Sequence, residues 1–177
     1  DQIAAEARAA VAEGAQSLHL HPFDKDGRET LEAVACAETI KAVRAACPRI
    51  PISLSTSAAI EADPIRRFEL ISAWTEQPDL VTANQGEDGI QDICGLLNSR
   101  GVGIEAGLLT SKDARLFVAS GLASKCYRVM VEPLDLDPED GVRHAEMIET
   151  IVTNAGIELE QVHHGYGIAC WDVNRRA

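Results

Sequence analysis

Short apolar runs of strand length alternate along the chain with longer segments whose apolar residues recur at helical spacing. This alternation is the feature that most constrains the fold. The predicted strands are residues 17–21, 51–56, 79–84, 102–106, 127–132 and 161–164. The predicted helices are residues 1–13, about 29–47, 64 to about 74, 90–100, 111–120, 138–155 and a last helix from about 168. Because the connections are short, consecutive strands require right-handed crossovers and form a parallel sheet.

The pattern inside the strands distinguishes an open doubly wound sheet from a (β/α)8 barrel. Strands of an open sheet are apolar on both faces, whereas here one face is apolar and the other becomes polar at the carboxyl end. Polar groups gathered at the carboxyl ends of parallel strands are typical of the mouth of a barrel. No glycine-rich phosphate loop follows a strand, which disfavours a nucleotide-binding Rossmann fold. The predicted fold is therefore α/β, a (β/α)8 TIM barrel in one domain over residues 1–177, truncated to about six strands and seven helices.

Charge and cysteine content restrict the partners and the compartment. The formal net charge of −12 argues against nucleic acid and anionic membrane surfaces as partners. No apolar run in the sequence approaches membrane-spanning length, and we expect no secretory leader, because no basic-then-apolar segment occurs in it. The five cysteines are dispersed, without Cys-x-x-Cys spacing or a neighbouring base. We therefore expect a cytoplasmic protein with reduced thiols and no thiol nucleophile.

Two histidines, His19 and His21, stand at the end of the first predicted strand. Residues i and i+2 of a strand share one face, so both imidazoles project together. Such a pair is suited to a divalent metal, with zinc the leading candidate. A catalytic zinc takes three protein ligands, and the in-phase candidates for the third are Glu105, Glu132 and His164. Two surface histidines on a polar strand end are the alternative interpretation.

Polar residues at the ends of other strands could complete an active site. Ser55, Thr82 and Asn84 could hydrogen-bond to a substrate carboxylate or carbonyl group. Glu105, near a bound cation, could act as a base or as an orienting group. Alternatively, Glu105 is a structural carboxylate paired with Arg128. A metal with an open coordination position could polarise a carbonyl oxygen or activate water.

Three further features have simpler interpretations. The segment Asp24-Lys25-Asp26-Gly27-Arg28 is predicted to be a polar turn, located where barrel enzymes place substrate-contacting loops. His163 is expected to face the helix layer. Trp74 and Trp171 are expected to be packing residues.

Taken together, these residues resemble the β-keto acid cleavage enzyme family, whose founding activity is 3-keto-5-aminohexanoate cleavage. The matching stretches are Gly14-Ala15 through Leu18-His19-Leu20-His21-Pro22, Asp26-Gly27-Arg28, Ser55-Thr56, Asp79 to Asn84, Gly103 to Leu108, and His164-Gly165-Tyr166-Gly167 with Trp171. The resemblance extends over essentially the whole chain, in the same order. It implies a (β/α)8 barrel that binds zinc through the His-x-His pair and a glutamate. The implied reaction is a retro-Claisen acyl transfer, in which a β-keto acid and acetyl-CoA give acetoacetate and a new acyl-CoA.

The resemblance also implies roles for individual residues. His19 and His21 would bind zinc, Glu105 would be a catalytic glutamate, and Ser55 and Thr82 match substrate-contacting positions. The family opens with a strand before the first helix and carries the third zinc ligand and an acidic base on a final strand, which we expect beyond Ala177. We therefore expect weak or no activity from this chain alone, and association into a homo-oligomer through open sheet edges. Pro22-Phe23 replaces the family's frequent Val-Arg, so the preferred β-keto acid is expected to differ.

Two other classes of function are compatible with the sequence. A metal hydrolase of the amidohydrolase type also uses His-x-His on a barrel strand. That class needs further histidines and an aspartate on later strands, where only His164 is in phase here. A non-catalytic barrel fragment is the other alternative, and it predicts that no metal is bound.

Overall fold

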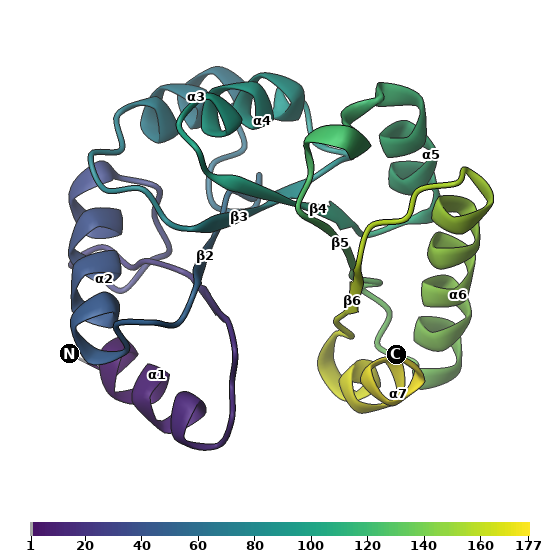
Figure 1. The fold of residues 1–177 in the computed structure, drawn as a ribbon, viewed down its shortest axis with the longest axis horizontal. Helices are drawn as coiled ribbons and strands as arrows, with labels where there is room; N and C mark the ends of the chain where they lie inside the picture. The colour runs from purple at the N-terminus through teal and green to yellow at the C-terminus, as the bar shows by residue number, and fades with distance from the viewer. Residues whose placement is uncertain (1) are drawn as a thin grey trace. The chain divides into compact units, whose positions relative to one another are not determined.

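The computed structural model describes residues 2–177, in which six strands alternate with seven helices (Figure 1). The strands are β1 (Leu18–Leu20), β2 (Ile52–Ser55), β3 (Leu80–Asn84), β4 (Gly103–Leu108), β5 (Arg128–Val131) and β6 (Gln161–His163). The helices are α1 (Gln2–Ala12), α2 (Ala33–Ala46), α3 (Pro64–Ser72), α4 (Ile90–Ser99), α5 (Ser111–Ser120), α6 (Pro138–Asn154) and α7 (Cys170–Arg176), with short 3-10 helices η1 (Leu122–Lys125) and η2 (Gly167–Ala169). Asp1, where the first predicted helix begins, lies outside the described residues.

The strands follow one another in the order β1-β2-β3-β4-β5-β6 in one sheet. The assigned registers, for example His19 opposite Ser53 and Glu105 opposite Arg128, are all parallel. Sequential parallel strands, each followed by a helix, are the arrangement of a (β/α)8 barrel. The predicted fold class is confirmed as a partial TIM barrel with six strands in the described part of the chain.

The chain divides into two compact units. The first comprises the residues up to Thr82 together with Gln91–Gly103, and the second comprises Ala83–Ile90 with Ile104–Ala177. Each unit has its own group of buried apolar side chains. In the first unit these come from α2, β2 and α3 and include Ile40, Ile52 and Ile71. The first unit therefore has a hydrophobic core of its own.

The core of the second unit is built from strands β4 and β5 and from three helices. It contains Phe117 of α5, Val129 and Val131 of β5, Ile148 of α6 and Val173 of α7, all completely buried. Figure 1 shows α5 and α6 along the same side of β5 and β6. The alternate residues of β5 point away from this core, and they include Arg128. The polar face of β5 predicted from the sequence is therefore the face opposite the helices.

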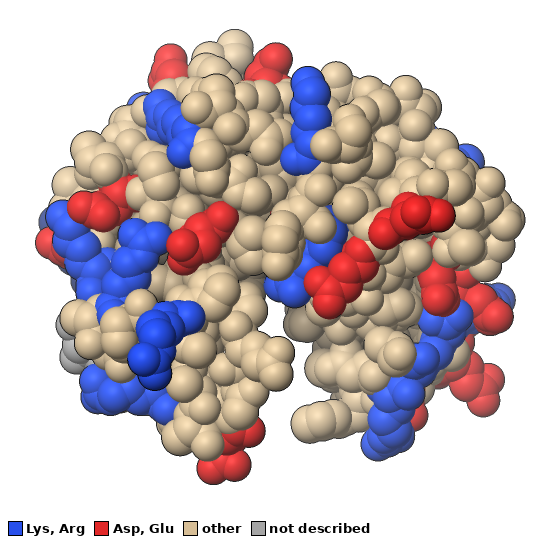
Figure 2. Space-filling view, in the orientation of Figure 1, with Lys and Arg blue, Asp and Glu red and all other residues tan. Residues whose placement is uncertain are grey.

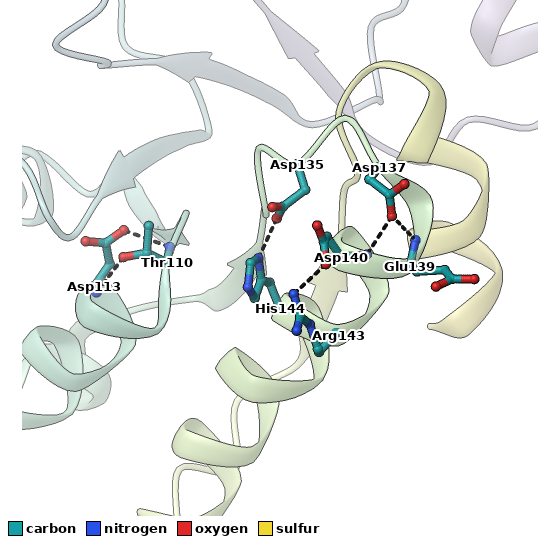
Figure 3. Close-up of polar contacts among 8 residues, drawn as sticks. All are labelled: Thr110, Asp113, Asp135, Asp137, Glu139, Asp140, Arg143 and His144. Carbon is teal, nitrogen blue, oxygen red and sulfur yellow. Dashed lines mark hydrogen bonds and ion pairs between the residues drawn. The ribbon is translucent and has the colours of Figure 1, made fainter.

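Local signals in the sequence determine where several helices begin. Thr110 and Asp113 form a capping box at the start of α5: the Thr110 hydroxyl accepts from the Asp113 N–H at 3.2 Å, and the Asp113 carboxylate accepts from the Thr110 N–H at 2.9 Å (Figure 3). Asp137 caps α6 ahead of Pro138, and Asp63 caps α3 in the same way. Carboxylate and hydroxyl caps satisfy N–H groups that have no partner inside the helix.

Two expectations about packing have opposite outcomes. Trp74 is buried, and its Nε1 donates a hydrogen bond to the Leu31 carbonyl oxygen at 2.9 Å, as expected of a packing residue. Trp171 is 69% exposed, so its predicted packing role is wrong. Helix α7 is short and buries Val173 against the core, which turns the neighbouring Trp171 outward.

Charged side chains of both signs form scattered groups on the face shown in Figure 2, including basic side chains over the region of α1 and α2. Within residues 2–177, no helix has the length and apolar character needed to cross a membrane.

Candidate functional site

The two predicted metal ligands converge in the first unit. His19 lies in β1, His21 follows two residues later, and their Nε2 atoms are 3.2 Å apart. The rings meet edge to face, with an interplanar angle of 74°. Two nitrogen ligands on one tetrahedral zinc, each at 2.0–2.1 Å, would be separated by about 3.3 Å. The Nε2 atoms therefore already have the spacing that a shared metal ion requires.

Hydroxyl groups from two neighbouring strands surround the other nitrogen of His19. Its Nδ1 lies 3.3 Å from the Ser53 hydroxyl on β2 and 3.4 Å from the Thr82 hydroxyl on β3. The parallel register explains the arrangement, because it places His19 opposite Ser53, and Ser55 opposite Thr82. Both hydroxyl-bearing residues at Nδ1 are buried, so they can fix the orientation of an otherwise exposed ring.

At His21, a carboxylate lies next to the Nδ1 atom. Glu29 Oε2 lies 2.8 Å from His21 Nδ1. The predicted polar turn at 24–28 is confirmed and brings the two side chains together. The Asp24 carboxylate accepts from the Asp26 and Arg28 N–H groups, after which the chain reverses and Phe23 pairs with Glu29 in an antiparallel bridge.

These contacts fit the requirements of a divalent metal. Metal-binding histidines usually engage a carboxylate, carbonyl or other polar group through the second ring nitrogen, which orients the ring. Both imidazoles meet this condition at Nδ1, and their Nε2 atoms lie 3.2 Å apart. Within residues 2–177, no three His, Cys, Asp or Glu side chains form a complete metal-binding group. A metal ion held by the histidine pair would therefore have two of its protein ligands in this unit.

In the second unit, Glu105 and Arg128 form an ion pair on the polar faces of β4 and β5. Arg128 Nε donates to Glu105 Oε1 at 2.7 Å, and one terminal guanidinium nitrogen lies 2.5 Å from the same oxygen. Glu105 is 1% exposed. The sequence left open a catalytic or a structural role for Glu105, and the structure shows the predicted arginine contact. An arginine that fixes the carboxylate is compatible with either role.

Glu132 immediately follows β5, on the same face as Arg128. Burial raises its pKa from 4.5 to about 7, and the negative charge of Glu105 contributes to the rise. A carboxyl group in this range can hold or release a proton near neutral pH. Glu132 is therefore the described carboxyl group best suited to exchange a proton in this unit.

The remaining predicted site residues have different surroundings. The Ser55 hydroxyl in the first unit accepts from the Ser57 N–H at 3.3 Å. Asn84 in the second unit donates to Glu87 Oε1 at 2.9 Å. His164 follows β6, and its backbone N–H donates to the Val131 carbonyl oxygen. These three residues lie at the carboxyl ends of their strands, as expected from the alternation.

Ser53 and Glu29 contact the histidines but were not among the predicted site residues. Ser53 could have been found, because it shares the polar face of its strand with Ser55. Glu29 carries no comparable signal, since its position depends on the reversal of the loop after β1. His163 faces the helix layer as predicted: burial lowers its pKa, with Glu149 of α6 and Arg176 of α7 nearby.

Three of the five cysteines, Cys36, Cys47 and Cys94, are buried. Within the described residues none forms a disulfide, and Cys36 is completely buried. Burial raises the pKa of the Cys36 thiol to about 12, which suppresses the thiolate needed for nucleophilic attack. Cys36 is therefore poorly suited to act as a nucleophile.

Several solved structures have a fold similar to that of this chain. Similar chains include ObcA in a binary complex with oxaloacetate (TM-score 0.66, 14% identity, covering 97% of this chain and 52% of ObcA). Another is a mandelate racemase/muconate lactonizing enzyme from Roseiflexus sp. (TM-score 0.56, 17% identity, 92% of this chain and 44% of that enzyme). Identities this low support the fold alone.

Sequence comparisons identify the family. The 3-keto-5-aminohexanoate cleavage enzyme of Fusobacterium nucleatum subsp. nucleatum is 33% identical over 92 residues. That match covers 51% of this chain, which spans only 34% of the curated relative's length. The family model of the beta-keto acid cleavage enzymes matches residues 1–151, most of the chain. The protein therefore belongs to the beta-keto acid cleavage enzyme family.

Proposed function

We propose that this chain contributes the histidine half of a zinc-dependent site for β-keto acid cleavage. The observation that carries the proposal is the 3.2 Å separation of the His19 and His21 Nε2 atoms, with each Nδ1 held by a partner. Zinc bound there would supply a Lewis acid that polarises the keto group of the substrate. Family membership supports the substrate class.

The proposed net reaction is an acyl exchange between a β-keto acid and acetyl-CoA. The substrate's bond between its acyl carbon and the CH2–COO⁻ fragment breaks, as does the acetyl–sulfur bond of acetyl-CoA. The acetyl group joins the CH2–COO⁻ fragment to give acetoacetate, and the acyl group of the β-keto acid joins the sulfur to give a new acyl-CoA. Atoms and electrons balance without an oxidant or reductant.

The chain's own polar residues would bind and orient the reactants. Ser55, Thr82 and Asn84 carry hydrogen-bonding groups at the carboxyl ends of β2 and β3, suited to carboxylate or carbonyl oxygens. Glu105, fixed by Arg128, would serve as the catalytic glutamate, either accepting a proton or orienting the substrate. In the second unit, Glu132 would retain a proton near neutral pH, which it could donate.

Metal binding and ligand recognition test this proposal on the 177-residue chain. Co²⁺ can replace zinc and give a visible spectrum that reports its ligands. We expect Co²⁺ to bind, and His19→Ala or His21→Ala to weaken binding at least tenfold. His144→Ala is the matched control, because this histidine pairs with Asp135 in the second unit at 2.8 Å (Figure 3). Absence of metal binding by the unmodified chain would support the non-catalytic alternative and refute the proposal.

The β-keto group is tested with a ligand pair. Acetoacetate should shift the Co²⁺ spectrum, whereas 3-hydroxybutyrate, which lacks the keto group, should shift it much less. Equal shifts would contradict recognition of the keto group. With zinc, a β-keto acid and acetyl-CoA, we expect at most slow release of acetoacetate from this chain alone. Hydrolysis of amides or esters in place of acyl exchange would favour the amidohydrolase-type alternative.

A further inference from the structure

The two imidazoles of the histidine pair have chemically different supports. Two neutral hydroxyl groups, from Ser53 and Thr82, face Nδ1 of His19 at 3.3 and 3.4 Å. A carboxylate, that of Glu29, faces Nδ1 of His21 at 2.8 Å. The shorter contact to a carboxylate is the stronger type of hydrogen bond. His21 is therefore the imidazole whose orientation depends on a single charged partner.

The loop after β1 holds Glu29 in place through its backbone. The Thr30 N–H donates to the Pro22 carbonyl oxygen at 2.9 Å, and Phe23 bridges to Glu29. The neighbouring cation, Arg28, pairs with Asp24 and Asp26 at 3.4 and 3.0 Å. The Arg28 guanidinium is thus engaged on the turn, while the Glu29 carboxylate is directed at His21.

The exposure of the pair indicates what it does for the protein. The His21 and Glu29 side chains are 37% and 42% exposed. Ion pairs this accessible to water contribute little to folding stability. A neutral imidazole, however, carries one N–H, and a carboxylate at Nδ1 keeps that hydrogen there and leaves the Nε2 lone pair for a metal. The contact therefore matters more for ligand orientation than for the fold.

We propose that Glu29 is a positioning residue, which holds His21 with Nε2 directed at the metal shared with His19. The inference rests on the proposed metal site and adds to it a residue outside the predicted ligand set. Carboxylates in this position typically strengthen metal binding by about 10- to 100-fold. Loss of Glu29 therefore weakens metal affinity without unfolding the chain.

Zinc affinity, measured by competition with a chromophoric chelator, tests the role of Glu29. We expect Glu29→Ala to bind zinc about 10- to 100-fold more weakly. Glu29→Gln keeps an acceptor at the same reach but loses the charge, so its affinity should be intermediate. Glu32→Gln is the matched control, with the same charge change three residues along; Glu32 pairs with Arg66 at 3.2 Å and should retain the original affinity.

The outcomes separate this inference from the metal site itself. If the unmodified chain binds zinc and Glu29→Ala binds it equally well, the positioning role is refuted while the metal site stands. If the unmodified chain binds no zinc, both are refuted. Thermal unfolding without metal serves as the structural readout, and the Glu29 variants should match the unmodified chain. A large loss of thermal stability in Glu29→Ala and Glu29→Gln would instead assign Glu29 a structural role and overturn the proposal.

Discussion

Replacing Glu132 by glutamine should stabilise this protein at alkaline pH and have little effect in acid. Burial and the charge of Glu105 raise the pKa of Glu132 from 4.5 to about 7 in the folded chain. In the unfolded chain the carboxyl group returns to its ordinary value. At pH 8 the folded protein must therefore carry a negative charge on Glu132 in surroundings that disfavour it. The glutamine side chain has the same shape but no charge, so it avoids this free-energy cost.

The expected magnitude follows from the shift in pKa. A rise from 4.5 to about 7, at about 1.4 kcal/mol per pKa unit, corresponds to roughly 3 kcal/mol. Below pH 4.5 the group is protonated in both states and adds no pH dependence. Between the two pKa values the folded state keeps a proton that the unfolded state loses, so stability falls as pH rises. Well above pH 7 the carboxyl group is ionised in both states, and the free energy of unfolding is lower by the full amount of roughly 3 kcal/mol.

Urea unfolding of both proteins at pH 5 and pH 8.5 measures this effect. The free energy of unfolding of Glu132→Gln relative to the unmodified chain should increase by about 2–3 kcal/mol between the two pH values. Glu158→Gln, which removes an exposed carboxylate before β6, is the control for net charge. A difference between Glu132→Gln and the unmodified chain that does not change with pH would refute the reasoning.

Two further substitutions test packing and ion pairing, both read by urea unfolding. Gly86→Ala should destabilise the chain by about 1–3 kcal/mol, because an added Cβ would lie 2.1 Å from Asp113 Oδ1. Gly95→Ala is the control: its added Cβ would have no atom within 4 Å, so the change should be neutral or stabilising by up to about 1 kcal/mol. Equal effects at the two glycines would contradict this account. Arg128→Met should cost about 3–5 kcal/mol by leaving the buried Glu105 carboxylate without its arginine, and adding Glu105→Gln should recover much of the loss. A single-variant cost below 1 kcal/mol would show that the pair is not needed to compensate a buried charge.

Signals that act over a few residues allowed the elements of this fold to be predicted. Helix α5 is an example: Thr110 and Asp113 predict its start, and Gly121, which has a positive φ of 70°, ends it. The strands are predicted from their alternation because one face is buried in a helix-covered core. Boundaries differ mainly where loops intervene, as in the second helix, predicted from about residue 29 and observed from Ala33.

The exposure of Trp171 was not predictable in this way. Its apolar character favours burial, but the orientation of α7 follows from Val173, which packs into the core of the second unit. Which residue of a short helix is buried depends on what the helix packs against. Composition and spacing alone do not contain that information.

The sequence by itself determined the fold class and the His-x-His pair, because hydrophobic periodicity and the two-residue repeat of a strand are local properties of the chain. Only the tertiary structure decided what surrounds these groups. The Glu29 carboxylate reaches His21 because a turn reverses the loop. The pKa of Glu132 is raised because the side chain is buried and lies near the negative charge of Glu105. Hydrogen bonds and electrostatic effects of this kind depend on distances between residues far apart in sequence, which are set only when the chain has folded.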